Sequence, residues 1–182
     1  MKVLDRWGQS IRINRAAKYI PHGARVLDVG CGDGALFRAL SSRISSGVGI
    51  DPEATPHQTG RFTIVKGDFP ADVGEAGQFD AVVALAVLEH IPREAQPAFA
   101  AACRDLLKPG ATLIVTVPAP AVDNIVHILQ MTPFADGVAC HQHYGFEPRE
   151  TLPVFQNAGL HVADLRRFEF GLNHLFVFRR PA

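Results

Sequence analysis

The stretch VLDVGCGDG, residues 26–34, constrains the fold of this chain more than any other segment. An apolar run of strand character breaks at Gly30 into three glycines spaced two residues apart, and a helix-like segment follows directly. Glycines this close together adopt backbone conformations that other residues disfavour, and they let a ligand approach the main chain. A strand, a glycine loop and a helix in this order predict a nucleotide-binding unit, with its ligand at the carboxyl end of the strand.

Strand-like and helix-like segments alternate along the rest of the chain. We expect strands at 25–30, 47–51, 62–68, 79–87 and 111–118, and helices at 3–20, 35–43, 93–108 and 148–159. Such alternation is typical of parallel strands joined by helices that cover both faces of the sheet. Three residues separate the last two strands, 161–170 and 174–180, which forces an antiparallel hairpin. The sequence predicts a three-layer, Rossmann-like α/β fold, in which a mostly parallel seven-stranded sheet has an antiparallel last strand.

Composition places the chain among ordinary globular proteins. Of its 182 residues, 47% are hydrophobic and 20% are charged, and the formal net charge is zero. We expect one domain, 1–182, and no nucleic-acid partner, because such binders usually carry a basic excess. No apolar run reaches the ~20 residues of a membrane-spanning helix, and the three cysteines are odd in number and far apart. These features favour a cytoplasmic protein without stable membrane insertion, and they leave the oligomeric state open.

Residues around the glycines indicate which ligand the loop binds. A phosphate-binding loop needs Gly-Lys-Ser/Thr, whereas Ala-Leu-Phe follows Gly34; the glycine spacing alone stays compatible with a dinucleotide. The carboxylate of Asp28 suits an ammonium better than a pyrophosphate. Asp51 ends the second strand, where it can bind both ribose hydroxyls, and Asp68 ends the third, where it can accept from an adenine amino group. An ammonium, a ribose and an adenine without phosphate describe S-adenosylmethionine.

These motifs resemble, in their order, the class I S-adenosylmethionine-dependent methyltransferases of the small-molecule type, along nearly the whole chain. The segments that carry the resemblance are VLDVGCGDG, GVGID, VKGDFP, FDAVVALAVLEHI and LLKPGATLIVTVP. The resemblance implies in-line methyl transfer from S-adenosylmethionine, with S-adenosylhomocysteine as product. It also implies a set of cofactor-binding positions: Asp28, Gly30, Cys31, Gly32, Gly34, Asp51, Pro52, Asp68, Phe69, Ala84 and Leu85. Phe69 is expected against the adenine, and 84–85 beside the methionine moiety, with contacts there mainly to the backbone.

Several of these positions also have an ordinary structural interpretation. Asp28 suits a cap that accepts hydrogen bonds from the loop, and either Asp51 or Asp68 alone suits the end of a strand. Cys31 suits a small residue in a tight loop, because no base or cation beside it in the sequence makes it a nucleophile. The joint placement of the three aspartates favours the functional interpretation.

Three histidines are candidates for a general base. His90 follows the fourth strand within LEH, next to the expected transfer site, where a structural or cofactor-shell role is the alternative. His141 and His143 lie in CHQHYGFE, inside the segment 119–147, which we expect to form a lid over the strand ends. Cys140 beside them raises the possibility of zinc, but no second Cys/His pair follows, so no metal is expected.

The N-terminal segment 1–22 predicts an amphipathic helix with a basic face, which either covers the cofactor site or docks on a membrane. The acceptor is expected to be a small, glycosyl or lipid-linked molecule, methylated on oxygen, nitrogen or carbon. Two other functions stay open. One is a non-catalytic cofactor-binding subunit that activates a partner. The other is an NAD(P)-dependent oxidoreductase, which is disfavoured because neither Tyr19 nor Tyr144 has a lysine four residues on.

Overall fold

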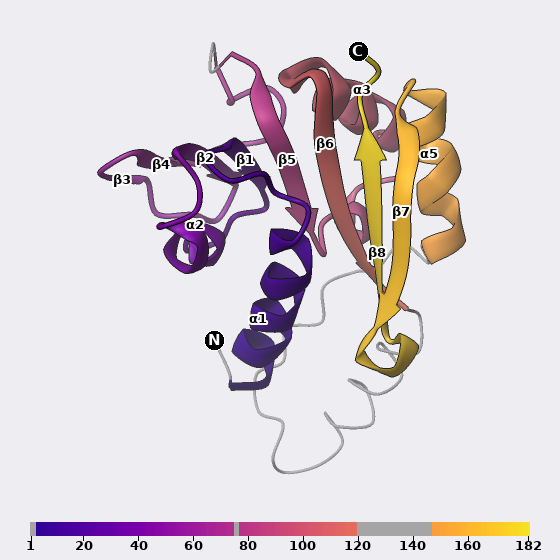
Figure 1. Cartoon of the computed structure of the whole chain (residues 1–182), viewed down its shortest axis with the longest axis horizontal. Coiled ribbons are helices and arrows are strands. Elements are labelled where there is room, and N and C mark those ends of the chain that lie inside the picture. The colour runs from indigo at the N-terminus through magenta and orange to yellow at the C-terminus, as the bar shows by residue number, and fades with distance from the viewer. Residues whose placement is uncertain (1–2, 75–76, 120–146) are drawn as a thin grey trace.

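The computed structural model describes residues 3–74, 77–119 and 147–182, which form one twisted sheet with helices on both faces (Figure 1). The strands are β1 (Arg25–Val29), β2 (Ser46–Asp51), β3 (His57–Thr59), β4 (Phe62–Lys66), β5 (Phe79–Leu85), β6 (Leu107–Pro118), β7 (His161–Phe168) and β8 (Asn173–Arg179). Their order in the sheet is β3-β4-β2-β1-β5-β6-β8-β7. The five central strands of this order, β4-β2-β1-β5-β6, run parallel, and β8 is antiparallel to both β6 and β7.

This arrangement confirms the predicted α/β fold and the antiparallel last strand, but the number of strands differs. All seven predicted strands are present, and β3 is an eighth, which pairs antiparallel with β4 at the edge of the sheet. Its three residues, His57-Gln58-Thr59, are polar and exposed. A strand of this kind has no alternation of apolar and polar residues, so the sequence gives no sign of it.

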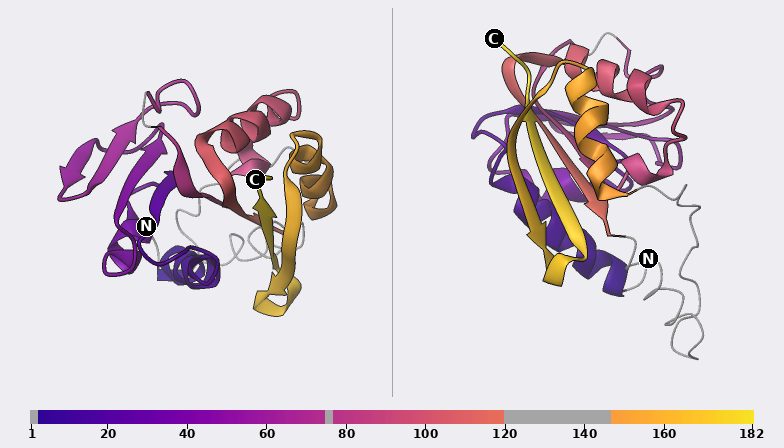
Figure 2. Two further views of the ribbon diagram at one scale, coloured as in Figure 1. Left: turned by 45° about the horizontal axis from the view of Figure 1, so that its top comes forward. Right: turned by 90° about the vertical axis from the view of Figure 1, so that its right-hand side faces the viewer.

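Helices cover the two faces of the sheet in pairs. The α-helices are α1 (Val3–Ala17), α2 (Ala35–Leu40), α3 (Gln96–Leu106) and α5 (Thr151–Asn157), with short 3₁₀ turns η1 (Leu88–His90), η2 (Pro148–Glu150) and η3 (Glu169–Gly171). Helices α1 and α2 lie on one face, and α3 and α5 lie on the other (Figure 2). Successive residues of β1 serve the two layers, since Val26 packs with the first pair and Leu27 with the second. Among the described residues, no helix is long and apolar enough to cross a bilayer.

All four predicted helices are shorter in the structure: α2 ends at Leu40 and not at 43, and α5 begins at Thr151, after the 3₁₀ turn η2. The N-terminal helix, predicted to reach residue 20, ends at Ala17, and its large apolar residue Trp7 is 62% exposed. The helix is buried instead through small and aliphatic residues near its carboxyl end, such as Ile13 and Ala16. The helix expected to run to 108 ends at Leu106, because Leu107 is already the first residue of β6, where it pairs with Phe79 of β5.

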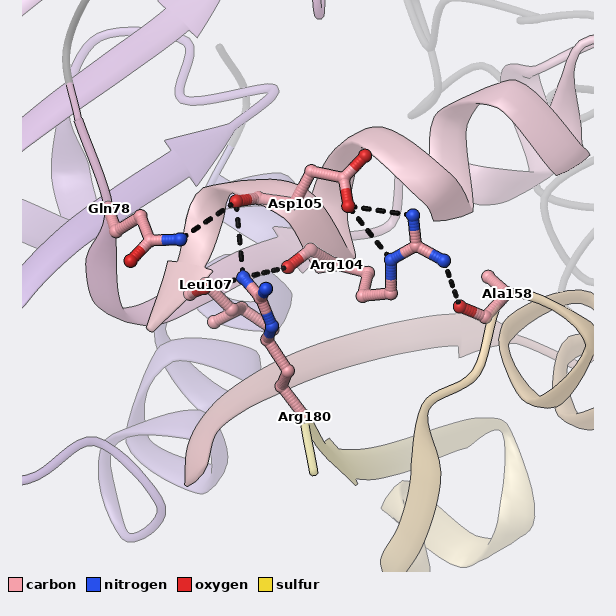
Figure 3. A network of polar contacts seen from close by, with 6 residues as sticks. All are labelled: Gln78, Arg104, Asp105, Leu107, Ala158 and Arg180. Carbon is pink, nitrogen blue, oxygen red and sulfur yellow. Dashed lines mark hydrogen bonds and ion pairs between the residues drawn. The ribbon is translucent and has the colours of Figure 1, made fainter. Parts of the chain in front are cut away.

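Two arginines hold the carboxyl end of α3 (Figure 3). The Nη1 atom of Arg180 donates to the carbonyl oxygens of Arg104 at 3.2 Å and Asp105 at 3.3 Å, and also to that of Leu107. Arg104 in turn donates from Nη1 to the carbonyl of Ala158, which follows α5, at 3.0 Å. The last carbonyls of a helix have no partner within the helix, and a cation there is favourable. These contacts join α3, α5 and the end of β8.

Candidate functional site

The glycine loop after β1 has a backbone that demands glycine. Gly30, Gly32 and Gly34 all have positive φ, at 73°, 51° and 77°. At Gly30 space is limiting as well, because an added Cβ would lie 2.5 Å from Cγ2 of Val87. At Gly32 an added Cβ would meet nothing within 4 Å. The loop therefore touches the segment after β5 on one side and is open on the other.

Asp51, the last residue of β2, holds this loop in place. Its Oδ2 accepts a hydrogen bond from the backbone N–H of Gly32 at 3.0 Å, and its Oδ1 accepts one from that of Glu53 at 2.8 Å. Each carboxylate oxygen can accept more than one hydrogen bond, so both retain capacity for hydroxyl donors. The next residue, Pro52, is exposed in the turn that follows. Asp51 is thus an oriented, half-buried carboxylate beside the open side of the loop.

Asp28 is the most perturbed acid of the site. It lies in β1 between Gly49 of β2 and Val83 of β5, and it is 4% exposed. Burial, and then the charge of Asp51, raise the pKa of its carboxyl to about 8. The neutral form therefore prevails at pH 7. A cation brought next to it would restore the charged carboxylate, because an opposite charge favours ionisation.

Cys31 sits in the same loop, but its side chain points into the protein. It is 3% exposed, and its Sγ fills the space where Gly49 would carry a Cβ, 2.7 Å away. Burial raises the pKa of the thiol, which leaves it without the thiolate that a nucleophile requires. Any part that this position plays in ligand binding falls to its backbone.

The third predicted carboxylate, Asp68, is exposed two residues beyond β4. Its neighbour Gly67 donates its N–H to the carbonyl oxygen of Asp51 at 3.2 Å, which brings the end of β4 to the end of β2. The adjacent ring of Phe69 is half-buried and packs edge-on against Phe99 of α3, with ring centroids 5.1 Å apart. Phe69 is therefore anchored in the core beneath α3, and only part of its surface remains for a ligand.

The end of β5 contains a feature that sequence reasoning missed. Ala84 is buried and Leu85 half-buried, as suits the last residues of a strand, but Ala86 has a φ of 58°. Its N–H donates to the carbonyl and hydroxyl oxygens of Thr116 on β6, at 3.0 and 3.1 Å. A left-handed alanine costs roughly 1–2 kcal/mol and is found where the surroundings impose it. No pattern in the sequence distinguishes this alanine from its neighbours.

The candidate bases divide into two groups. His90 is exposed at the end of η1, and its backbone N–H donates to the carbonyl oxygen of Val87 at 3.0 Å. Because Val87 contacts Gly30, His90 lies at the same edge of the sheet as the glycine loop. His141 and His143 lie outside the described residues, as does nearly all of the expected lid.

Comparison with known proteins identifies the kind of molecule that carries this site. The profile of a family described as "Methyltransferase domain" matches residues 9–165. The ubiquinone biosynthesis O-methyltransferase of Xylella fastidiosa (strain 9a5c) is 31% identical, over 85% of this chain and 68% of that protein. The enzyme of the same name from Pseudomonas aeruginosa (strain LESB58) is 32% identical, over 79% and 67%.

Solved structures agree on the fold. The 1,6-didemethyltoxoflavin-N1-methyltransferase of Burkholderia thailandensis, with bound S-adenosylhomocysteine, superposes with a TM-score of 0.74 at 20% identity, covering 98% of this chain and 82% of that one. A putative methyltransferase complexed with the Haloferax volcanii Trm112 activator gives 0.71 at 21% identity, covering 98% and 96%.

The chain belongs to the methyltransferase domain family. It is a methyltransferase, and it shares its fold with solved methyltransferases, one of which holds S-adenosylhomocysteine. The family decides between the predicted alternatives in favour of methyl transfer over nicotinamide-dependent oxidation.

Proposed function

We propose that this methyltransferase binds S-adenosylmethionine across the carboxyl ends of β1, β2, β4 and β5 and methylates a hydroxyl oxygen of a small molecule. The observation that carries the proposal is the buried carboxyl of Asp28 beside an open glycine loop. Its pKa of about 8 reflects a charge without compensation, and the ammonium of the cofactor supplies that compensation. In this arrangement the Asp51 carboxylate binds the ribose hydroxyls, and Asp68 accepts from the adenine.

The residues at the end of β5 would set the position of the reacting groups. When bound, the cofactor supplies a methyl group activated by its sulfonium. The chain's part is to hold an acceptor atom in line with that methyl group, and a rigid backbone serves this purpose. The left-handed Ala86, fixed to Thr116 by two hydrogen bonds, provides such a backbone next to Leu85.

The choice of oxygen is supported by the two relatives described above, 31% and 32% identical, which are both named O-methyltransferases. A hydroxyl of high pKa gains from a general base, and we propose His90, His141 or His143 for this role. Whether the acceptor carries a sugar or a lipid tail is a second question, for which the exposed Trp7 and the segment 119–147 are candidate contacts.

Labelled cofactor provides the test. The protein is incubated with methyl-labelled S-adenosylmethionine and one of three samples of cellular small molecules. The first sample is untreated, the second is acetylated, which blocks both hydroxyls and amines, and in the third only the amines are capped. We expect label to enter the untreated and the amine-capped samples and not the acetylated one. Label that disappears with amine capping alone would contradict O-methylation, and absence of turnover in every sample would favour a non-catalytic subunit.

The base is tested separately once label transfer is seen. His90→Ala is compared with His22→Ala, which removes an exposed histidine before β1. We expect His141→Ala or His143→Ala to lower turnover more than cofactor affinity, because a lid acts on the transfer step. Unchanged turnover in both lid variants would leave His90 as the proposed base.

A further inference from the structure

A trough runs along the sheet between α1 and β7, away from the glycine loop. In Figure 1, α1 lies in front of the sheet, with β8 and β7 to its right. A cavity of about 330 Å³ opens here, and its floor consists of Phe168 and Leu175, both buried. Three strands, β5, β6 and β8, separate β7 from β1 in the sheet, so this cavity is distinct from the proposed cofactor site. We call it the α1–β7 trough.

The trough concentrates positive charge in a protein of zero net charge. Arg15 and Lys18 line it from the side of α1, and Arg166 and Arg167 line it from β7. None of its lining residues is acidic. An adjoining cavity of about 460 Å³ shares Lys18 and adds Arg43 and Arg179, together with one acid, Asp164. Concave surfaces lined by one sign of charge raise the local concentration of oppositely charged ligands.

Side-chain contacts orient two cations of the trough, Arg166 and Arg15. The hydroxyl of Tyr19 donates to Oδ2 of Asp164 at 2.7 Å, and Nε of Arg166 donates to the same oxygen at 3.0 Å. The hydrogen bond from Tyr19 keeps the pKa of Asp164 low, so this carboxylate stays charged and orients Arg166. Across the trough, the guanidinium of Arg15 lies 6.0 Å from the centre of the Phe168 ring.

We propose that the α1–β7 trough binds the phosphate group of a small organic ligand. A phosphate monoester carries about −1.5 to −2 charges at pH 7, which matches several cations better than a single carboxylate does. A guanidinium group can donate two parallel hydrogen bonds to the oxygens of one phosphate. In Arg166 the Nε atom contacts Asp164, so the two terminal nitrogens of Arg166 carry its remaining donors. The Phe168 and Leu175 floor offers an apolar surface to the carbon part of the ligand. The ligand comes either from solution, as a phosphorylated metabolite, or from a lipid headgroup.

Binding of inorganic pyrophosphate and of vesicles tests the proposal. Pyrophosphate is titrated by calorimetry and by amide NMR shifts, and vesicles of phosphatidylglycerol are compared with vesicles of phosphatidylcholine. We expect one of the two phosphate sources to bind, with shifts confined to the end of α1 and to β7. Pyrophosphate binding without vesicle binding assigns a soluble ligand, and retention on phosphatidylglycerol vesicles alone assigns a headgroup. No binding of either source to the wild-type protein would overturn the proposal.

Paired variants distinguish a specific phosphate-binding site from non-specific electrostatic attraction to the protein. Arg15→Gln with Arg166→Gln should lower the affinity for the bound phosphate source about tenfold, whereas Arg61→Gln with Arg149→Gln removes the same charge elsewhere and should leave it unchanged. Arg166→Lys keeps the charge but loses the fork, and should lower affinity several-fold. Equal effects of the two double variants, or an unchanged Arg166→Lys, would overturn the proposal. The affinity for S-adenosylhomocysteine should not change in any of them, which separates this test from that of the proposed function.

Discussion

Replacing Asp28 by asparagine tests whether the buried carboxyl is kept for a cation. In the folded protein its pKa rises from 3.8 to about 8, first because of burial and then because of the charge of Asp51. The folded state therefore holds the proton more tightly than the unfolded chain does. The contribution of this group to stability is complete below pH 3.8, decreases as the pH rises, and is lost once the pH passes about 8.

The size of the effect follows from this interval. One pKa unit corresponds to about 1.4 kcal/mol, so the roughly three units between the ordinary pKa and pH 7 lower the free energy of unfolding by up to about 4 kcal/mol. Asparagine has nearly the same shape and carries no charge. Without ligand, Asp28→Asn should therefore unfold at higher urea concentration than wild type at pH 7, and the difference should shrink toward pH 4.

The same substitution that stabilises the ligand-free protein should weaken its binding of the cofactor. An ammonium beside Asp28 favours the charged carboxylate, so wild-type protein should release about 0.9 proton on binding S-adenosylhomocysteine at pH 7. Its affinity should then rise about tenfold per pH unit between pH 6 and 7.5. The Asp28→Asn variant should lose this dependence and bind more weakly at pH 8.

Urea unfolding from pH 4 to 8 measures the first effect, and calorimetry in buffers of different protonation enthalpy measures the second. Asp33→Asn makes the same chemical change at an exposed position of the same loop and should alter neither. If Asp28→Asn unfolds at the wild-type urea concentration throughout this range and releases as many protons on binding, Asp28 is an ordinary loop cap and the cation argument is wrong.

Three further substitutions address the loop and the helix end. Asp51→Ala should weaken binding of S-adenosylhomocysteine by about 1.5–3 kcal/mol in calorimetry, since the proposed charged acceptor of the two ribose hydroxyls is removed. Wild-type affinity in a normally melting variant would refute this. Gly30→Ala should destabilise the protein by about 1–3 kcal/mol in urea unfolding, and adding Val87→Ala should recover only the steric part. An equal loss in both backgrounds would contradict that contact. Arg180→Ala should lower the unfolding free energy by about 1–3 kcal/mol, because several carbonyls lose their donor, whereas the exposed Arg179→Ala should have little effect; equal melting temperatures would contradict the role of Arg180.

Much of the fold could be predicted because its signals are local. The stretch 26–29, apolar apart from Asp28, indicates a strand, and the glycines after it indicate a backbone conformation that requires glycine. The connection between β7 and β8 is likewise so short that its length alone predicts antiparallel pairing of the two strands. Element ends were less accurate, because packing decides them: Leu107 leaves α3 to pair with Phe79, although the Pro-Gly pair follows two residues later.

The features that could not be predicted depend on contacts between distant segments. Tyr19 and Asp164 are 145 positions apart, and their hydrogen bond exists only because α1 and β7 meet over β8. The left-handed conformation of Ala86 is imposed by Thr116, thirty positions on. The raised pKa of Asp28 likewise arises from burial between two neighbouring strands, whereas its sequence context shows only an acidic residue before a glycine loop.

The two edge strands of the sheet have a consequence for self-association. An edge strand exposes unpaired backbone groups, and a long, flat and apolar one invites other chains to pair with it. Here one edge is β3, which is short and polar, and the other is β7, which has a register irregularity between Val162 and Asp164 and carries Arg166 and Arg167 beyond it. Neither offers a regular template for an incoming strand. Cross-chain sheet extension, the first step toward fibrillar aggregation, is therefore disfavoured at both ends of the sheet.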